Sequence, residues 1–236
     1  MTLDLHSFPD GGMALVLGAS GGIGGALQAA LQQSGRFETV QGLSRRDGFD
    51  LTDEASIARA ADATAAAGAP LRLVLVATGL LHDDRQQPEK SWRQLDGEQL
   101  ARSFAINASG PALVAKHFLP LLPRQGKAVF AALSAKVGSI GDNQLGGWYG
   151  YRAAKAALNQ LLHTAAIELA RNRPEALCLT LHPGTVATGL SAPFSGTAHP
   201  PVAPQAAAER LLAVIDRATA ADSGKLLDHT GLPLPW

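Results

Sequence analysis

The stretch Leu15-Val16-Leu17-Gly18-Ala19-Ser20-Gly21-Gly22-Ile23-Gly24 ends an apolar run and opens an alanine-rich segment with helical periodicity. In this context glycine lets the backbone approach a pyrophosphate closely, and the helix N-terminus offers unsatisfied N–H groups and a favourable dipole. The spacing differs from the commoner GxGxxG, and a tight strand-to-helix turn is the alternative interpretation. The candidate phosphate contacts are Gly18, Ser20, Gly21, Gly22, Ile23 and Gly24.

Outward from this turn, short apolar runs alternate with long helical segments, which predicts βαβ units on a doubly wound, Rossmann-type parallel sheet with helices on both faces. The length of 236 residues favours one α/β domain, 1–236, over two. The seven predicted strands are Met13–Gly18, Thr39–Leu43, a short one near Phe49–Leu51, Leu71–Ala77, Ala128–Leu133, Leu177–His182 and Lys225–Asp228. The predicted helices are Ile23–Ser34, Asp53–Ala67, Gly97–Leu122, Tyr149–Asn172 and Pro204–Thr219.

Charge and cysteine content narrow the function class. Acidic and basic residues balance at 20 each and form no basic block, so neither a nucleic acid nor a membrane is expected as partner, and a small molecule is favoured. The single cysteine, Cys178, has no intrachain partner, which favours a reducing cytoplasm. The first apolar stretch, Met13–Leu17, is too short for a signal or membrane segment, and no metal site is expected.

The end of the second strand, Gly42-Leu43-Ser44-Arg45-Arg46, falls where a doubly wound fold places the residue that meets the adenosine ribose. An acidic residue there would repel a 2′-phosphate, whereas Ser44 followed by two arginines would bind one, because arginine pairs with phosphate bidentately. The pattern therefore favours NADP(H) as cofactor. The alternative is that Arg45 and Arg46 are solvated loop charges.

Tyr151 and Lys155 form an i, i+4 pair on one face of a predicted helix. A free phenol titrates near about 10, and a neighbouring ammonium together with a cationic nicotinamide would lower the phenol pKa toward the working pH, as acid–base catalysis requires. Taken alone, the pair has a second interpretation as two exposed side chains on a helix surface.

The glycine turn, Arg45 and the Tyr151/Lys155 pair, in this order, resemble the short-chain dehydrogenase/reductase family over essentially the whole chain. The resemblance implies that Asn107, Ser134, Tyr151 and Lys155 are catalytic, with Tyr151 as general acid/base and Lys155 on the ribose. It also implies cofactor contacts in the Asp50-Leu51-Thr52 stretch and in His182–Thr188. The complete set of further expected cofactor contacts is Ser44, Arg45, Arg46, Asp50, Leu51, Ala77, Thr78, Gly79, Asn107, Tyr151, Lys155, Pro183, Gly184, Val186 and Thr188.

Finer matches resemble the carbonyl-reductase branch that includes C-factor and sniffer: Pro88-Glu89-Lys90-Ser91, Val137-Gly138-Ser139-Ile140, Gly146-Gly147-Trp148-Tyr149 and Pro235-Trp236. The implied function is hydride transfer between NADP(H) and a carbonyl or alcohol. The alternatives are a regulatory or sensor protein that binds NADP, or a lyase or epimerase that retains it. The resemblance also allows a homodimer or homotetramer.

The substrate is expected between residues 139–148 and 191–204. Trp148, Leu145, Leu190 and Phe194 in and beside these segments suggest an apolar ligand, or equally serve as loop anchors.

Two departures from the family pattern stand out. Val76-Ala77-Thr78-Gly79 replaces the usual Asn-Asn-Ala-Gly, and Ala135 stands where the family has its catalytic serine. Ser134 is favoured as the substitute over Ser139, although adjacent strand residues face opposite ways, so Ser134 needs a bulge or twist to reach the site.

Overall fold

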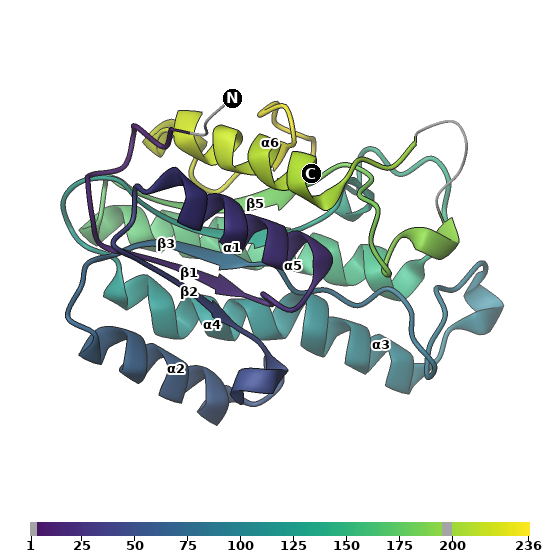
Figure 1. Ribbon diagram of the computed structural model, residues 1–236. Coiled ribbons are helices and arrows are strands. Elements are labelled where there is room, and N and C mark those ends of the chain that lie inside the picture. The colour runs from purple at the N-terminus through teal and green to yellow at the C-terminus, as the bar shows by residue number, and fades with distance from the viewer. Residues whose placement is uncertain (1–3, 195–199) are drawn as a thin grey trace.

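The computed structural model describes residues 4–194 and 200–236. Within these residues the sheet has six parallel strands in the order β2-β1-β3-β4-β5-β6 (Figure 1). Strand order reverses between β1 and β3, and open parallel sheets bind ligands at the carboxyl ends of the strands beside such a reversal. The strands are β1 (Met13–Leu17), β2 (Thr39–Leu43), β3 (Leu71–Val76), β4 (Ala128–Leu133), β5 (Ala176–His182) and β6 (Leu226–Asp228).

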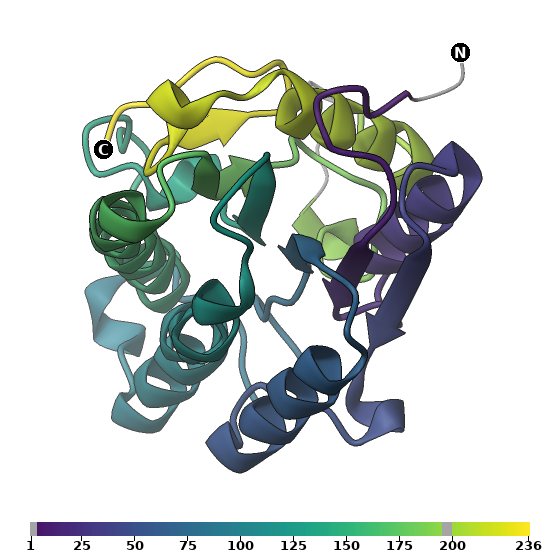
Figure 2. The same ribbon diagram turned by 90° about the vertical axis from the view of Figure 1, so that its left-hand side faces the viewer.

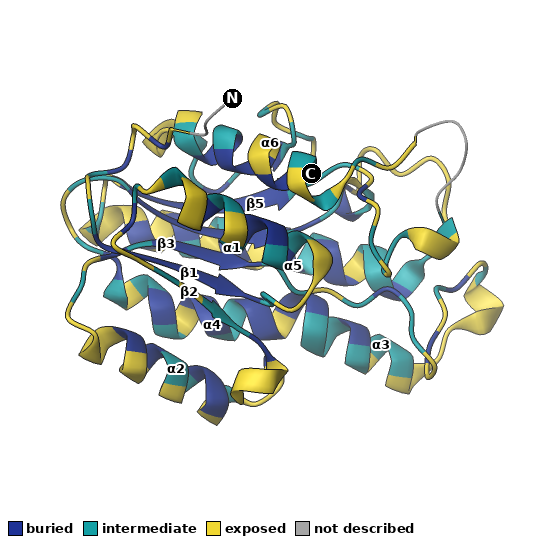
Figure 3. Ribbon diagram, viewed as in Figure 1, coloured by how far each residue is buried: buried dark blue, intermediate teal, exposed yellow. Residues whose placement is uncertain are grey.

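Helices cover both faces of the sheet (Figure 2). One face carries α1 (Gly22–Ser34) and α6 (Pro204–Arg217), whose apolar residues share a core with alternate strand residues such as Val16. The other face carries α2 (Glu54–Ala66), α4 (Gly110–Phe118) and α5 (Tyr149–Asn172). Every residue of β1 is buried (Figure 3), as expected for a parallel sheet covered on both sides. No helix among the described residues is long and apolar enough to cross a membrane.

The prediction of a doubly wound α/β fold is confirmed, but the seventh strand near Phe49–Leu51 is wrong. This segment follows β2, the edge strand, and its backbone bonds locally. Phe49 N–H donates to Ser44 O (3.1 Å) and Asp50 N–H to the Ser56 hydroxyl (2.7 Å). The remaining predicted strands agree with the structure to within one residue at each end.

The segment Gly97–Leu122, predicted as one helix, is helical up to Leu121, but the helix is not uniform. A π-helical turn, Ala105–Ser109, separates α3 (Gly97–Phe104) from α4, and the final residues tighten into a 3₁₀ turn. Pro111 follows this turn and has no N–H to donate to the carbonyl four residues back. Gly110 N–H instead reaches five residues back, to Ala105 O. Such bulges occur frequently at functional sites.

Candidate active site

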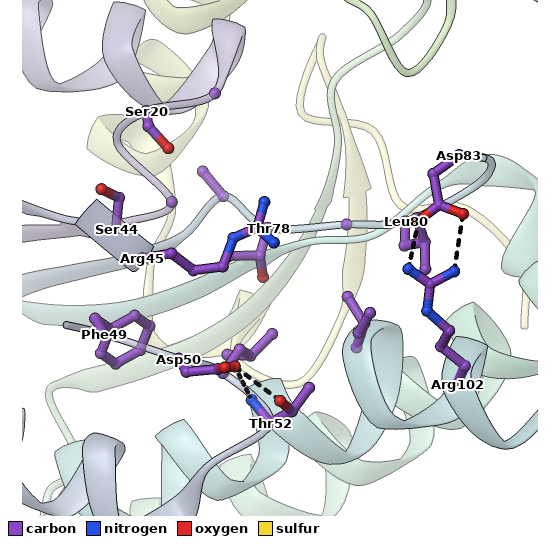
Figure 4. Close-up of a pocket in the computed structure, with 16 residues that line it drawn as sticks. Ser20, Ser44, Arg45, Phe49, Asp50, Thr52, Thr78, Leu80, Asp83 and Arg102 are labelled. Atoms are coloured by element: carbon purple, nitrogen blue, oxygen red, sulfur yellow. Dashed lines mark hydrogen bonds and ion pairs between the residues drawn. The ribbon is translucent and has the colours of Figure 1, made fainter. Parts of the chain in front are cut away.

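A cleft of about 440 Å³ opens at the carboxyl ends of the strands, beside the reversal between β1 and β3 (Figure 4). Backbone of the glycine turn and of the loop after β3 lines it together with side chains from the loop after β2 and from α3. The lining residues are Gly18, Ser20, Gly21, Ser44, Arg45, Phe49, Asp50, Leu51, Thr52, Ala77, Thr78, Gly79, Leu80, Asp83, Arg102 and Ile106.

The glycine turn is shaped by contacts that admit no side chain. A Cβ on Gly24 would lie 2.2 Å from Gly18 O, and one on Gly18, whose φ is +91°, would lie 2.9 Å from Ala77 O. Gly21 occupies the N-cap position of α1, where within the described chain no side chain caps the helix. The first-turn N–H groups, including those of Gly22, Ile23 and Gly24, therefore remain available to an anion.

The two arginines after β2 lie differently. Arg45 lines the cleft, and its side chain extends into it (Figure 4). Among the described residues its guanidinium makes no hydrogen bond or ion pair. Arg46 is exposed and is absent from the cleft wall as described. Ser44 is buried, and its hydroxyl donates to Asp47 Oδ2 (2.7 Å), which shapes the turn that carries Arg45.

Asp50 and Leu51 line the same end of the cleft. Asp50 Oδ1 accepts from the backbone N–H (2.9 Å) and hydroxyl (2.8 Å) of Thr52. These two hydrogen bonds, with the nearby Arg45 charge, hold the pKa of Asp50 below its ordinary value, so the carboxylate is an acceptor at neutral pH. Leu51 is buried against Gly110.

The loop after β3 links the cleft to the predicted catalytic residues. Ala77, Thr78 and Gly79 all line the cleft, and within the described residues the buried Thr78 Oγ1 has no hydrogen-bond partner. A Cβ on Gly79 would lie 3.5 Å from Asn107 Oδ1 and 3.9 Å from Lys155 Nζ. Gly79 thus marks the point where three distant segments meet.

Asn107 lies fully buried inside the π-helical turn. Its Oδ1 accepts from Leu80 N–H (2.9 Å), and its Nδ2 donates to Leu80 O (2.7 Å). The side-chain amide therefore completes a backbone-like pairing with the loop after β3, and it fixes that loop beside Lys155.

Tyr151 and Lys155 meet as their spacing predicts. Lys155 Nζ lies 5.7 Å from the Tyr151 ring centre and donates to Leu133 O (2.7 Å). Burial raises the pKa of Tyr151 to about 12 and lowers the pKa of Lys155 to about 7. The direction for the phenol is opposite to that expected from the sequence, because in the protein alone desolvation outweighs the neighbouring ammonium.

The segment after β5 returns to the glycine turn. A Cβ on Gly22 would lie 3.0 Å from Thr188 Cγ2, which brings this predicted contact to the start of α1. Val186 is buried and bridges to Val202. Pro183 and Gly184 lead from β5 into this segment, with Gly184 at φ +76° against the His229 ring. The four predicted contacts of this segment are not among the residues that line the cleft as described, so their contact with the cofactor stays a prediction.

Comparison with known proteins agrees with this geometry. The family model described as enoyl-(acyl carrier protein) reductase matches residues 22–221, most of the chain. A 1-hydroxy-2-glutathionyl-2-methyl-3-butene dehydrogenase from Rhodococcus sp. (strain AD45) is 30% identical over 94% of this chain and 98% of its own length. The chain belongs to the short-chain dehydrogenase/reductase family. The family predicted from the sequence is therefore confirmed.

Two solved structures of short-chain dehydrogenase/reductase fold support the predicted carbonyl-reductase resemblance at the level of fold. An NADPH-bound carbonyl reductase from chicken fatty liver has a TM-score of 0.83 and 24% identity, covering 96% of this chain and all of its own. The carbonyl reductase Sniffer of D. melanogaster has a TM-score of 0.80 and 21% identity, covering 95% of this chain and 99% of its own.

Ala135 stands at the position where the family has its catalytic serine. The β4–β5 ladder runs in register to Leu133 and continues as Ser134 N–H donates to Leu181 O (2.8 Å). No bulge turns Ser134 toward the cleft. The buried Ser134 hydroxyl donates to Asn159 Oδ1 (2.7 Å), and the buried Ser139 Oγ accepts from Asp142 N–H (3.1 Å).

Arg102 and Asp83 are cleft residues that sequence reasoning missed. The Arg102 guanidinium on α3 pairs bidentately with the Asp83 carboxylate, which holds the pKa of Asp83 well below its ordinary value (Figure 4). Asp83 lies in the connection between β3 and α3, beyond Gly79, the last residue of that connection predicted as a contact. No sequence signal pointed to the pair, because the two residues are 19 positions apart and meet only in the folded chain.

Of the apolar residues predicted for the substrate region, some lie near the site and one is exposed. Trp148 contacts Phe194 edge to face (5.2 Å between ring centres), and Leu190 approaches Gly79, where a Cβ would lie 3.7 Å from Leu190 Cδ1. Leu145, by contrast, is 91% exposed. Of the predicted 191–204 loop, residues 195–199 lie outside the described residues.

Proposed function

We propose that this oxidoreductase is NADP-dependent and transfers hydride between the nicotinamide and a carbonyl or alcohol, with Tyr151 as the proton-transferring group and residues 1–236 as one domain. The observation that carries the proposal is that Lys155 Nζ, which lies 5.7 Å from the Tyr151 ring centre, and Asn107 Oδ1 both lie beside Gly79, which is part of the cleft wall. A purely structural Tyr and Lys pair would have no reason to adjoin a ligand-sized cleft.

The cleft fits a phosphorylated dinucleotide. The glycine turn and the start of α1 suit its pyrophosphate. The Arg45 guanidinium, for which no hydrogen-bond or ion-pair partner is found among residues 4–194 and 200–236, suits a 2′-phosphate, and Asp50 and Thr78 suit hydrogen-bonding groups of the adenosine part. The NADPH bound in the chicken carbonyl reductase supports the same choice. When bound, the nicotinamide supplies or accepts the hydride.

The residues of this chain supply the proton and its placement. With its pKa near 12, the Tyr151 phenol keeps its proton at neutral pH, so the protein alone favours the donor form that carbonyl reduction needs. Lys155 is held by Leu133 O at the position from which it would meet ribose hydroxyls. Asn107 holds the loop after β3 against it. The serine assignment, Ser134 or Ser139, remains a proposal that substitution must decide.

Incubation of the protein with NADPH and a panel of aldehydes and ketones tests the function. Steady loss of reduced-nicotinamide absorbance is the expected result. Stoichiometric binding without turnover would instead support the regulator, lyase or epimerase alternatives. Apolar carbonyls head the panel, because Trp148, Phe194 and Leu190 converge near the site. Thioether alcohols with NADP⁺ test the reverse direction, which the name of the Rhodococcus relative suggests.

Assembly into a homodimer or homotetramer is part of the proposal, with α4 and α5 as the surfaces that would pair. Leu161 (42%) and Ile167 (52%) are exposed apolar residues on α5, which suits such pairing. Sedimentation or light scattering of the purified chain decides the state.

A further inference from the structure

The helix that carries Tyr151 begins without a cap of its own. Trp148 occupies the N-cap position of α5 in the left-handed region (φ 54°, ψ 41°), and no side-chain cap is found there within the described chain. Gly146 and Gly147 before it also have positive φ, 64° and 67°. A non-glycine residue in this region is strained and persists only where its surroundings hold it.

Glu89, far away in sequence, supplies what the helix lacks. Its carboxylate accepts from Gly150 N–H (3.3 and 3.2 Å), and its backbone carbonyl accepts from Trp148 N–H (2.5 Å). A carboxylate at a helix N-terminus also interacts favourably with the helix dipole. A single residue therefore fixes both positions that flank the start of α5, and Tyr151 follows directly.

The contact is closely fitted. Glu89 is only 6% exposed, and burial of a carboxylate is costly unless hydrogen bonds satisfy it. A Cβ on Gly150 would lie 2.9 Å from Glu89 Oε1, so a side chain at 150 would displace the carboxylate. From the other side, Arg152 Nε donates to Gly147 O (3.0 Å) and its guanidinium to Val137 O (3.2 Å). The start of α5 is thus held between two anchors.

We propose that Glu89 is a positioning residue, which caps α5 and holds Trp148 in its left-handed conformation so that the Tyr151 phenol is fixed beside Lys155 and the Trp148 indole. The Trp148 and Tyr151 ring centres are 6.4 Å apart. This inference gives a role to the Pro88-Glu89-Lys90-Ser91 stretch. It rests on the proposed function only through the catalytic part of Tyr151.

The kinetic test compares Glu89→Ala, Glu89→Gln and Asp96→Ala. Asp96 caps α3 in the same way, through Gln99 N–H (2.9 Å), but has no bond to α5, so its loss controls for the removal of a cap. We expect Glu89→Ala to lower kcat about 10- to 100-fold, because small misplacements of catalytic groups cost that much. Glu89→Gln, which keeps an oxygen acceptor, should restore most of kcat, and the NADPH Kd should stay unchanged in all three.

A kcat for Glu89→Ala within a few-fold of wild type would overturn the proposal. So would a loss that Glu89→Gln does not repair, or one that follows thermal stability equally in Glu89→Ala and Asp96→Ala.

A second readout needs no turnover. The chain has two tyrosines, so in a Tyr149→Phe background phenolate absorbance reports Tyr151 alone. Near the ordinary tyrosine pKa of about 10, the Tyr151 phenol with Glu89 intact should remain un-ionised, because desolvation raises its pKa to about 12. Adding Glu89→Ala should produce phenolate at that pH, since a frayed first turn admits water, while circular dichroism shows the protein folded. Identical titrations would refute positioning by Glu89, even if no carbonyl substrate is found.

Discussion

At the Arg45 end of the cleft, neighbouring residues build each feature. Gly18 abuts Gly24, Ser44 shapes the turn of Arg45, and Asp50 bonds Thr52. At the Tyr151 end, the Tyr151/Lys155 pair comes from one helix, but other contacts join distant segments, such as Gly79 with Lys155, Leu80 with Asn107, and Glu89 with Gly150. Arg45 and Asp50 are also exposed, whereas Lys155 and Asn107 are buried. The binding residues are therefore placed mainly by local contacts, and the catalytic residues mainly by contacts between distant segments.

The largest effect should come from the buried end. Tyr151→Phe deletes only the ionisable oxygen, so we expect kcat to fall about 10²–10⁴-fold, the usual contribution of a positioned acid or base. The NADPH Kd, measured by nucleotide fluorescence, should stay the same because the Arg45 end is untouched. Turnover within a few-fold of wild type would remove Tyr151 from the mechanism.

Lys155→Met tests the catalytic role of the Lys155 ammonium and the effect of its burial on stability. Loss of the ammonium should impair turnover with NADPH and NADH alike, since both carry the ribose hydroxyls that Lys155 would hold. It should also change the pH dependence of stability. Burial lowers the pKa of Lys155 to about 7 in the folded protein, so between there and its ordinary value of about 10.4 the unfolded chain binds more protons. The wild type should therefore gain stability as pH rises through this window.

Denaturant unfolding of wild type and Lys155→Met near pH 6 and near pH 10 measures this effect. The free energy of unfolding of Lys155→Met, relative to that of wild type, should be higher near pH 6 than near pH 10 by a few kcal/mol, because burial of the charged ammonium destabilises the wild type most at the lower pH. Ala153, an exposed neighbour on α5, offers a control in Ala153→Ser, which should show no such pH dependence. A difference between Lys155→Met and wild type that is constant with pH would mean that water reaches Lys155.

Arg45→Asp should have a moderate effect at the exposed end. Loss of a charge-assisted phosphate contact, worth about 1.5–3 kcal/mol, together with new repulsion should weaken NADPH about 10- to 100-fold relative to NADH. Arg46→Asp makes the same change in charge one residue away from the cleft wall and should leave the ratio of the two Kd values nearly unchanged. Equal weakening of both cofactors by Arg45→Asp would show that Arg45 selects neither.

The same division explains what the sequence could predict. Strands, the glycine turn and Arg45 follow from short-range patterns, and the Tyr151/Lys155 pair follows from helical spacing. The extra strand near Phe49–Leu51 was predicted from its apolar residues. Their pattern does not show that the backbone here makes local hydrogen bonds instead of joining the sheet. The π-helical turn is followed by Pro111, whose missing N–H is visible in the sequence, but the way the chain accommodates it is not. Glu89 and Arg102 acquire their partners only in the folded chain.

The smallest effect is expected at Ser134, although the sequence alone favours it as the polarising hydroxyl with about a hundredfold effect on kcat. In the structure its proton is directed to Asn159 Oδ1, and the regular strand leaves Ala135 in the position of the family serine. Ser134→Ala should therefore change kcat only a few-fold and lower the free energy of unfolding by about 1 kcal/mol, the usual value of one hydrogen bond.

Ser139→Ala is the matched comparison, because no acceptor is found for the Ser139 proton among the described residues. Steady-state kinetics and denaturant unfolding of both variants decide the assignment. A hundredfold loss of kcat in Ser134→Ala at unchanged stability would restore Ser134 to the role, and a larger loss in Ser139→Ala would give it to Ser139. Two mild effects would leave Tyr151 as the side chain that holds the substrate oxygen.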